Sequence, residues 1–223
     1  MKRFKVSEYI TPKEADAIIL ACPKVRDRLI LRTMWETGGR VSEVLALIPS
    51  YLDPVNNCIY LTNLKQHTES GIVPLKRIYL FPESTLIKDL LTYIKENKIE
   101  NDKWVFQGKS ITKGKVGQIS SNYVLYMLTN TEHGRKEGLA SRLGIRKIKG
   151  EKLKPAWSHL WRHGAAMNIY HRTQRLDVTQ KQLGHSTIMT TEGYAELGDD
   201  DRKKIINRSR NADKADKREA ISR

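Results

Sequence analysis

"VRDRLILRTMWETGGRVSEVLAL", residues 25–47, indicates the fold more clearly than any other stretch of the chain. Its large apolar residues recur three and four positions apart, which predicts an amphipathic helix from about residue 25 to residue 36. The expected inner face of this helix consists of Val25, Leu29, Ile30 and Met34. Gly38 and Gly39 then end the helix. "SEVLAL" predicts a second, short helix with Ser42 near its cap.

The preceding stretch, "TPKEADAIILAC" at 11–22, is also predicted to be helical. Thr11 suits the N-cap, Pro12 suits the first helical position, and Glu14 completes a capping box. Two consecutive helices are therefore expected before the Gly-Gly break.

The hydrophobic period changes in the middle of the chain. "CIYLTNL" (58–64) and "GIVPL" (71–75) are typical of strands joined by a polar turn, and "RIYLF" (77–81) is a candidate third strand. Helical spacing returns at 84–97. The shared face of that helix consists of Leu86, Leu90, Leu91 and Ile94.

The later stretches are mainly helical in pattern. Further helices are expected from "SSNYVLYML" onward and at 156–170, 177–183 and 187–195. Residues 131–154 predict a helix followed by an exposed basic loop, and Trp161 is expected to pack in the core. The fold class is therefore α+β, mainly α, with a small antiparallel three-stranded sheet.

The charge of the chain favours a polyanionic partner. Lys and Arg number 40 against 25 acidic residues, a formal net charge of +15, and each phosphate that they neutralise releases counterions. A generically basic protein is the plain alternative. Aromatic residues make up only 7%, which argues against single-strand binding by base stacking. No basic helix has a wide aromatic face for a membrane surface, and the longest apolar run, "AIILAC", is too short to cross a bilayer.

Cysteine usage indicates a reducing compartment. Cys22 and Cys58 are the only cysteines, and their spacing implies neither a zinc site nor a disulfide framework. "MKRFK" is not followed by the apolar run of a secretion signal. We expect a cytoplasmic, nucleoid-associated protein.

Four separated sites carry residues suited to phosphate chemistry. They are Arg40 with Glu43, His159 with Arg162 on one helical face, His185 after a glycine, and Tyr194 nine residues later. Taken singly, each has an ordinary explanation: an ion pair, a solvated helix face, a capping histidine and a packed tyrosine.

In combination, the four sites resemble the tyrosine recombinases, also called the phage integrase family. The matching motifs are "TGGRVSEVLAL", "HLWRHGAA" and "LGHSTIMTTEGYA", and the resemblance covers roughly residues 8–197. The sites agree with the family in residue type, order and separation. The resemblance is therefore specific.

The resemblance implies a role for each matching residue. Tyr194 is the implied nucleophile, and the implied phosphate-binding residues are Arg40, His159, Arg162 and His185. Relatives also carry a catalytic lysine on a β-hairpin after the first arginine. Lys65 is its match, and Lys76 lies just beyond the following strand. Glu43 is expected to orient the first arginine, whereas His163 is expected to be structural.

The chemistry explains why these residue types are needed. Attack on a phosphodiester builds negative charge, and a guanidinium offers a permanent charge and a planar fork to phosphate oxygens. His159 can take the phenol proton and Lys65 can protonate the departing 5′ oxygen. A phosphotyrosine ester conserves the energy of the broken bond. We therefore expect no ATP, metal or other cofactor, and we interpret "DDD" at 199–201 as solvated.

The expected partner is double-stranded DNA at a specific site. Relatives usually have a separate N-terminal helical domain that closes around the duplex, but only about ten residues precede the first helix here. The chain thus resembles either a minimal recombinase or an excised catalytic domain. Basic side chains would then supply the affinity, unless they form a solvated face. The candidates are Lys109, Lys113, Lys115, Arg142, Arg146, Lys147, Lys149, Lys152 and Lys154.

The expected domain organisation is a catalytic domain over 1–198 and a charged tail over 199–223. Relatives donate a C-terminal helix to a neighbouring subunit, and Ile205 and Ile206 are the apolar residues available for this exchange. We expect a homotetramer on DNA and a monomer or weak oligomer when free. An accessory DNA-bending protein or a partner recombinase is a further candidate partner.

Site-specific recombination is the favoured function, with two alternatives. A type IB topoisomerase uses the same chemistry but reseals the original strand, and a DNA-binding regulator would have lost catalysis. Every catalytic position carries a competent residue, which argues against the regulator. Integration, excision, inversion and resolution are all outcomes that this chemistry allows.

Overall fold

The computed structural model describes residues 9–63, 73–109, 116–129, 138–149, 152–155 and 158–184. The first helix, α1 (Pro12–Leu20), begins at an N-cap formed by Thr11. The Glu14 backbone N–H donates to Thr11 Oγ1 at 3.3 Å, and the Thr11 backbone N–H donates to Glu14 Oε2 at 2.8 Å. The predicted capping box is confirmed.

The second helix, α2 (Val25–Thr37), ends at Gly38, as predicted. Its predicted inner face is buried at Leu29, Ile30 and Met34, but Val25 is 57% exposed. The prediction for Val25 is wrong because the first turn of α2 buries the carboxylate of Asp27 instead. The helical spacing predicted which side of α2 faces the core, but not the residue at which the buried face begins.

The short helix α3 (Val41–Leu45) begins one residue earlier than predicted. Its N-cap is Arg40, which has an extended backbone and whose carbonyl accepts a hydrogen bond from the Val44 N–H at 2.9 Å. Ser42 is the second residue of the helix, near its cap as predicted. The earlier start places an arginine at the entrance of α3.

The predicted three-stranded antiparallel sheet is confirmed; residues 77–79 of the candidate strand "RIYLF" belong to it, whereas the strand Leu52–Asp53 was not predicted. A 3₁₀ turn (Pro49–Tyr51) leads into β1 (Leu52–Asp53), which pairs with β2 (Cys58–Thr62), and β2 pairs with β3 (Leu75–Tyr79). Of "GIVPL", only Leu75 belongs to a described strand. Pro74 has no N–H for a ladder and contributes only its carbonyl, which accepts from the Asn63 N–H at 2.8 Å.

The predicted helix at 84–97 is present as α4 (Leu86–Glu96). Leu86 and Leu90 are buried, but Leu91 is 40% exposed and Ile87 is buried in its place. The core stripe of α4 is narrow, and Leu91 lies beyond its edge at about 100° per residue. This part of the predicted face is wrong.

Two hairpins and two helices follow. They are β4 (Gln107–Lys109) with β5 (Val116–Gln118), then α5 (Ser121–Thr129) and α6 (Leu139–Arg142), and then β6 (Arg146–Lys149) with β7 (Lys152–Pro155). The predicted basic loop therefore contains a β-hairpin. The sequence did not predict this hairpin because lysines flank both Ile148 and Leu153, its paired apolar residues, in the sequence.

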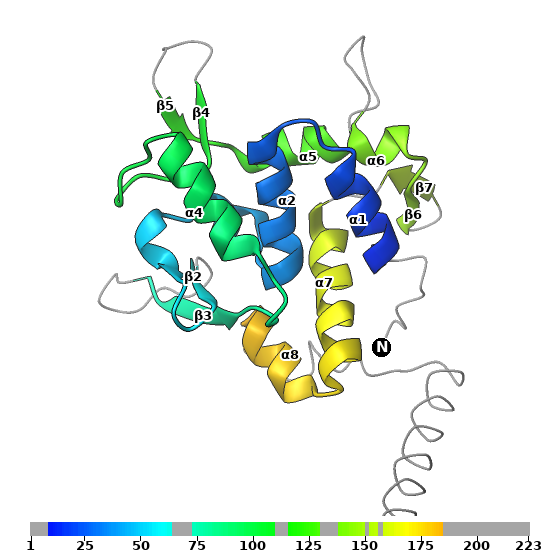
Figure 1. The fold of residues 1–223 in the computed structure, drawn as a ribbon. Coiled ribbons are helices and arrows are strands. Elements are labelled where there is room, and N and C mark those ends of the chain that lie inside the picture. Colours follow the sequence, from blue (N-terminus) through cyan, green and yellow to red (C-terminus); the bar gives the residue numbers. More distant parts are fainter. Residues whose placement is uncertain are drawn as a thin grey trace, which may run out of the picture.

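The helices α7 (Ser158–Thr173) and α8 (Leu176–Leu183) complete the described fold. Figure 1 shows α2 and α7 side by side in the centre, with α8 below them and next to β3. Trp161 on α7 is fully buried, contacts Trp35 edge-to-face at 6.0 Å between ring centroids, and donates to the Leu31 carbonyl at 3.0 Å. Its predicted core role is confirmed.

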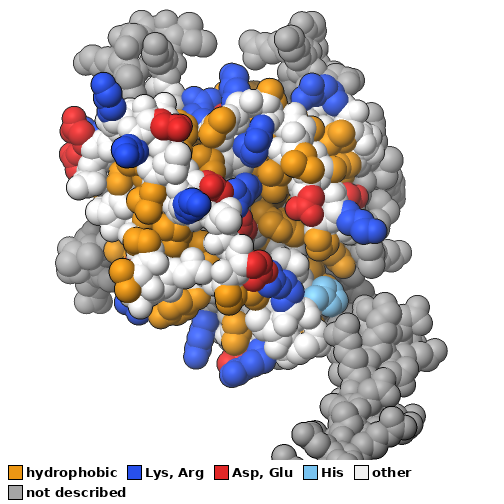
Figure 2. All heavy atoms as spheres, in the orientation of Figure 1, with side chains coloured by type: hydrophobic (Ala, Val, Ile, Leu, Met, Phe, Trp, Pro, Cys, Tyr) orange, Lys and Arg blue, Asp and Glu red, His pale blue; other side chains and the backbone are white. Residues whose placement is uncertain are grey.

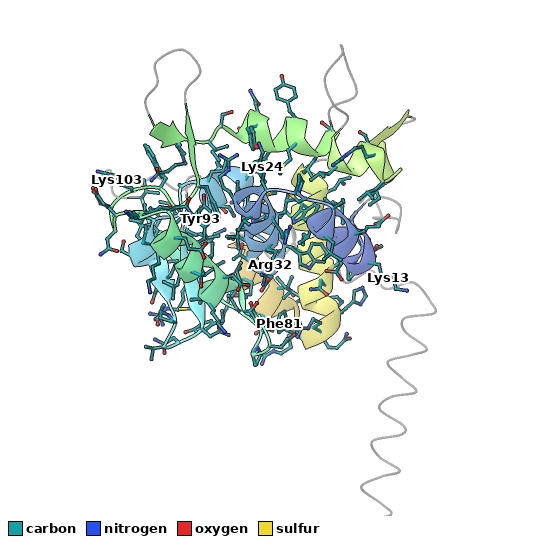
Figure 3. All side chains as sticks on the ribbon, turned by 45° about the horizontal axis from the view of Figure 1, so that its top comes forward. Lys13, Lys24, Arg32, Phe81, Tyr93 and Lys103 are labelled. Carbon is teal, nitrogen blue, oxygen red and sulfur yellow. The ribbon has the colours of Figure 1, made fainter. Side chains whose placement is uncertain are left out.

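Polar contacts also fix α2 against α4. Arg32, labelled in Figure 3, donates from Nη1 to Asp89 Oδ2 at 2.5 Å and from Nε to Glu36 Oε1 at 3.2 Å. Helix α2 is therefore held by α7 and α4. Among the residues described, none of the helices combines the length and apolar character that crossing a membrane requires.

Candidate active site

The Gly38–Gly39 turn brings Arg40 to the start of α3. Gly38 has a left-handed backbone with φ of +62°, and a Cβ atom at this position would lie 2.6 Å from Leu183 Cδ2. The turn therefore packs against the end of α8 at a distance that only glycine permits. The Arg40 side chain, 27% exposed, follows directly.

Glu43 is the acidic centre of the site and its side chain is fully buried. Its Oε1 accepts from Arg40 Nη1 at 2.6 Å, and its Oε2 accepts from the Arg40 backbone N–H at 2.9 Å. Burial alone would raise the pKa of Glu43, but the charge and hydrogen bond of Lys76 and the hydrogen bonds of Arg40 outweigh it. The pKa is lowered, so Glu43 is a carboxylate at neutral pH.

Arg162 joins this region to α7 and α8. It is 5% exposed and donates from Nη1 to the Gly38 carbonyl and from Nη2 to the Leu183 carbonyl, both at 2.7 Å. The Gly38 carbonyl lies two residues before Arg40. Arg162 thus connects motifs that are more than 100 residues apart in the sequence.

Lys76 approaches from β3, with a side chain that is 9% exposed. Its Nζ donates to Glu43 Oε2 at 2.6 Å and to the Leu183 carbonyl at 3.5 Å. Burial lowers the pKa of Lys76 to about 8; Glu43 opposes this shift, while the positive charges of Arg162 and Arg40 add to it.

These four residues form what we call the cationic cluster: Arg40, Glu43, Lys76 and Arg162. The charges of these four side chains alone sum to +2 when Lys76 is protonated. A buried excess charge is costly unless a counter-charge offsets it. Guanidinium groups match the oxygens of a phosphate in charge and geometry. The cluster is therefore suited to binding an anion.

The structure places the other predicted catalytic residues only in part. His159 lies in the first turn of α7, one turn before Arg162, but its side chain lies outside the described part. His163 follows Arg162 and is half-buried, with an interaction of its own. Outside the described residues lie Lys65, His185 and Tyr194. Gly184, which precedes His185, is the left-handed C-cap of α8.

The predicted DNA-binding residues lie on the two hairpins and α6, or outside the description. Arg142 is exposed at the end of α6. Lys109 belongs to β4, and Arg146, Lys147, Lys149, Lys152 and Lys154 belong to β6 and β7, with side chains that are not described. Lys113 and Lys115 lie outside the described residues. On the face in Figure 2, Lys and Arg side chains are interspersed with acidic and hydrophobic ones.

The sequence motifs assigned no role to Lys76, the fourth residue of the cationic cluster. In the strand "LKRIY" it lies two residues before the buried Ile78. Side chains at i and i+2 share one face of a strand. A strand beginning at Leu75 would therefore have placed Lys76 on the buried face.

Comparisons with known proteins agree with the fold and the motifs. A family model described as "Phage integrase family" matches residues 8–200. A resolvase of Escherichia coli is 26% identical over 204 residues, which cover 86% of this chain and 75% of the resolvase.

Two solved structures show the same fold. The XerA recombinase has a TM-score of 0.66 at 20% identity, covering 94% of this chain and 67% of XerA. The XerH site-specific recombinase, solved with its difH substrate in a pre-cleavage complex, has a TM-score of 0.60 at 20% identity, covering 84% of this chain and 49% of XerH. The family match spans most of the sequence, so the chain belongs to the phage integrase family, that of the tyrosine-type site-specific recombinases.

Proposed function

We propose that this protein cuts and rejoins double-stranded DNA at a specific site through a 3′-phosphotyrosine intermediate. The observation that supports this proposal most is the cationic cluster, in which Arg40 binds the buried Glu43 carboxylate and Arg162, from a separate motif, binds the carbonyl of Gly38 two residues before Arg40. A net charge of +2 matches a phosphodiester that gains negative charge during attack. The 27% exposure of Arg40 opens the cluster to an incoming backbone phosphate.

The first step is a transesterification. The Tyr194 phenolic oxygen attacks the scissile phosphorus, His159 accepts the phenol proton, and the bond between phosphorus and the 5′ oxygen breaks. Lys65 donates a proton to the departing 5′ oxygen. A phenol has an ordinary pKa of about 10, so nearby positive charge and His159 are both needed to make it reactive. His185 donates a further hydrogen bond to the phosphate.

The second step reverses the first with another strand. A 5′-hydroxyl attacks the phosphotyrosine, the phenol leaves and regains its proton, and a phosphodiester forms. One ester bond is broken and one is formed in each step. The reaction therefore requires no ATP, and the two arginines supply the charge neutralisation that a metal ion provides in other phosphoryl transfers.

The partner in this proposal is duplex DNA. Similarity to XerH, which was solved with its difH substrate, supports this assignment. Basic residues of the β4–β5 and β6–β7 hairpins and Arg142 would contact the backbone. We further propose a catalytic domain over 1–198 and a tail over 199–223 that exchanges between the subunits of a tetramer.

Covalent trapping tests the proposal. Duplexes would first be selected for binding from a random library. A nick beside the scissile phosphate would let the short fragment that carries the released 5′-hydroxyl diffuse away, so that the strand cannot be resealed. Wild type should accumulate a denaturation-resistant adduct, whereas Tyr194→Phe should bind with the same affinity and form none. Absence of an adduct with full duplex affinity would favour a DNA-binding regulator. Relaxation of a supercoiled plasmid that lacks any selected site would favour a topoisomerase.

A further inference from the structure

Lys76 is a buried cation between exposed neighbours. Leu75 and Arg77, the adjacent residues of β3, are exposed, whereas the Lys76 side chain turns inward and is 9% exposed. Lysine loses hydration and rotamer freedom when it is buried, so burial requires specific partners. The partners on α3 and α8 indicate what Lys76 does.

The ammonium of Lys76 links two elements of the site. It binds Glu43 Oε2 on α3 at 2.6 Å and approaches the Leu183 carbonyl at the end of α8 at 3.5 Å. The same carbonyl accepts from Arg162 Nη2 at 2.7 Å. A Cβ atom on Gly184 would lie 3.1 Å from Lys76 Cδ, so the lysine stem packs against the C-cap of α8.

We propose that Lys76 is a positioning residue for DNA strand cleavage, which fixes the Glu43 carboxylate and the end of α8 so that Arg40 and Arg162 hold the phosphate together. The inference rests on the proposed function. Lys76 acts through Glu43: with Oε2 bound to Lys76, Oε1 is directed to the Arg40 guanidinium at 2.6 Å. Without Lys76, Oε2 keeps the Arg40 backbone N–H but loses its cationic partner, so the carboxylate holds the Arg40 guanidinium less firmly.

The charge of Lys76 should matter as well as its size. The charged groups that face it in the described residues are Glu43 on α3, Arg40 at the α3 cap and Arg162 on α7. Burial brings the pKa of Lys76 to about 8. Wild-type cleavage should therefore fall as pH rises through this value, because the neutral amine no longer holds the carboxylate firmly.

The experiment compares three variants of the full chain on the nicked duplex. Lys76→Met keeps the stem and removes the charge, and Lys76→Arg keeps a charge that persists above pH 8. Arg77→Met, a change at its exposed strand neighbour, is the control because the Arg77 guanidinium lies over the Tyr60 ring, 5.1 Å from its centroid. Duplex affinity, thermal unfolding and single-turnover cleavage are measured for each variant.

Lys76→Met should cleave at least about tenfold more slowly with duplex affinity within about threefold, whereas Arg77→Met should cleave normally. Lys76→Arg should recover part of the rate and lose the decline above pH 8. In a Glu43→Gln background, Lys76→Met should cost less than about threefold, because the two residues act as one unit.

The contrary outcomes are distinct. Two results would overturn the inference while the proposed function stands. One is normal cleavage by Lys76→Met, and the other is an equal loss of cleavage rate from Lys76→Met in wild type and in Glu43→Gln. If Lys76→Met does not fold, an unchanged pH decline in Lys76→Arg overturns it instead. Failure of wild type to form any adduct would overturn the proposed function itself, and this inference with it.

Discussion

The two ends of α2 carry buried charge networks of opposite character. At the N-terminal end, Arg26 Nε donates to Asp27 Oδ1 at 2.8 Å, Tyr123 Oη donates to Asp27 Oδ2 at 2.6 Å, and Arg26 Nη2 donates to Tyr123 Oη at 2.8 Å. One cation meets one carboxylate. At the C-terminal end, the cationic cluster holds three cations and one carboxylate: Arg40 and Lys76 bind Glu43, and Arg162 binds two nearby backbone carbonyls.

Under the proposed function, the difference in charge balance separates a structural network from a phosphate-binding one. The first network is neutral and its members satisfy one another, so it has no excess charge to offer a ligand. Burial and then the Asp27 carboxylate raise the pKa of Tyr123 to about 12, which makes this phenol a poor nucleophile. A phenol near the cationic cluster would experience the opposite influence. The two networks therefore differ more in their net charge than in their burial, and the proposed phosphate site is the network with excess positive charge.

The largest expected difference is in the cleavage rate after replacement of one arginine at each end of α2, Arg162 and Arg26. Arg162→Lys removes the planar fork from a buried position and should slow single-turnover cleavage by about 10³-fold or more. Arg26→Lys should leave cleavage within about threefold, because it is remote from the cluster. Comparable losses in both variants would remove the functional distinction between the two ends.

Asp27→Asn should be the next largest change, and it should affect stability alone. Removal of the carboxylate leaves Arg26 and Tyr123 without a charged partner, at a cost of about 2–3 kcal/mol in the free energy of unfolding. Urea unfolding measures this loss. Spectroscopic titration of tyrosine should show the pKa of Tyr123 falling from about 12. A parallel loss of cleavage would contradict a purely structural role.

The lowered pKa of Glu43 predicts a smaller, pH-dependent effect. Because Glu43 binds its proton more weakly in the folded state, its contribution is present above the ordinary pKa and is lost as pH falls through the folded value. As pH falls below the ordinary glutamate range, wild type should therefore lose more stability than Glu43→Gln in urea unfolding. Parallel stability curves would show that the carboxylate is not held by its cations.

The smallest effect is expected for an exposed ion pair. Arg175 Nη2 and Asp177 Oδ2 lie 2.6 Å apart on the surface at the start of α8. Asp177→Asn should leave the urea midpoint of unfolding nearly unchanged, and salt should screen what the pair contributes. A larger effect would mean that α8, and with it the cluster, depends on its first turn.

Local chemistry predicted the helices well because their signals lie within a few residues. The capping box of Thr11 and Glu14 and the Gly38 stop are examples. The bounds of β3 were predicted only in part, as "RIYLF", because they are set by pairing with β2, with Cys58 opposite Tyr79 and Thr62 opposite Leu75. "GIVPL" is the more strand-like stretch by composition, yet "LKRIY" forms the ladder.

The same limitation explains the missing member of the site. Arg40, Glu43 and Arg162 were predicted from motifs, and the structure brings them into one cluster. Lys76 belongs to no motif, and its contacts with Glu43 and Leu183 cross 33 and 107 positions of sequence. Only the folded chain brings such residues together.

Peptide mapping of the trapped DNA adduct is the most direct test of the phosphate-binding, tyrosine-linked mechanism. After nuclease and protease digestion, mass spectrometry should find the residual nucleotide on the peptide that contains Tyr194 and on no other. A nucleotide attached to a different side chain, or an undiminished adduct in Tyr194→Phe, would contradict the mechanism.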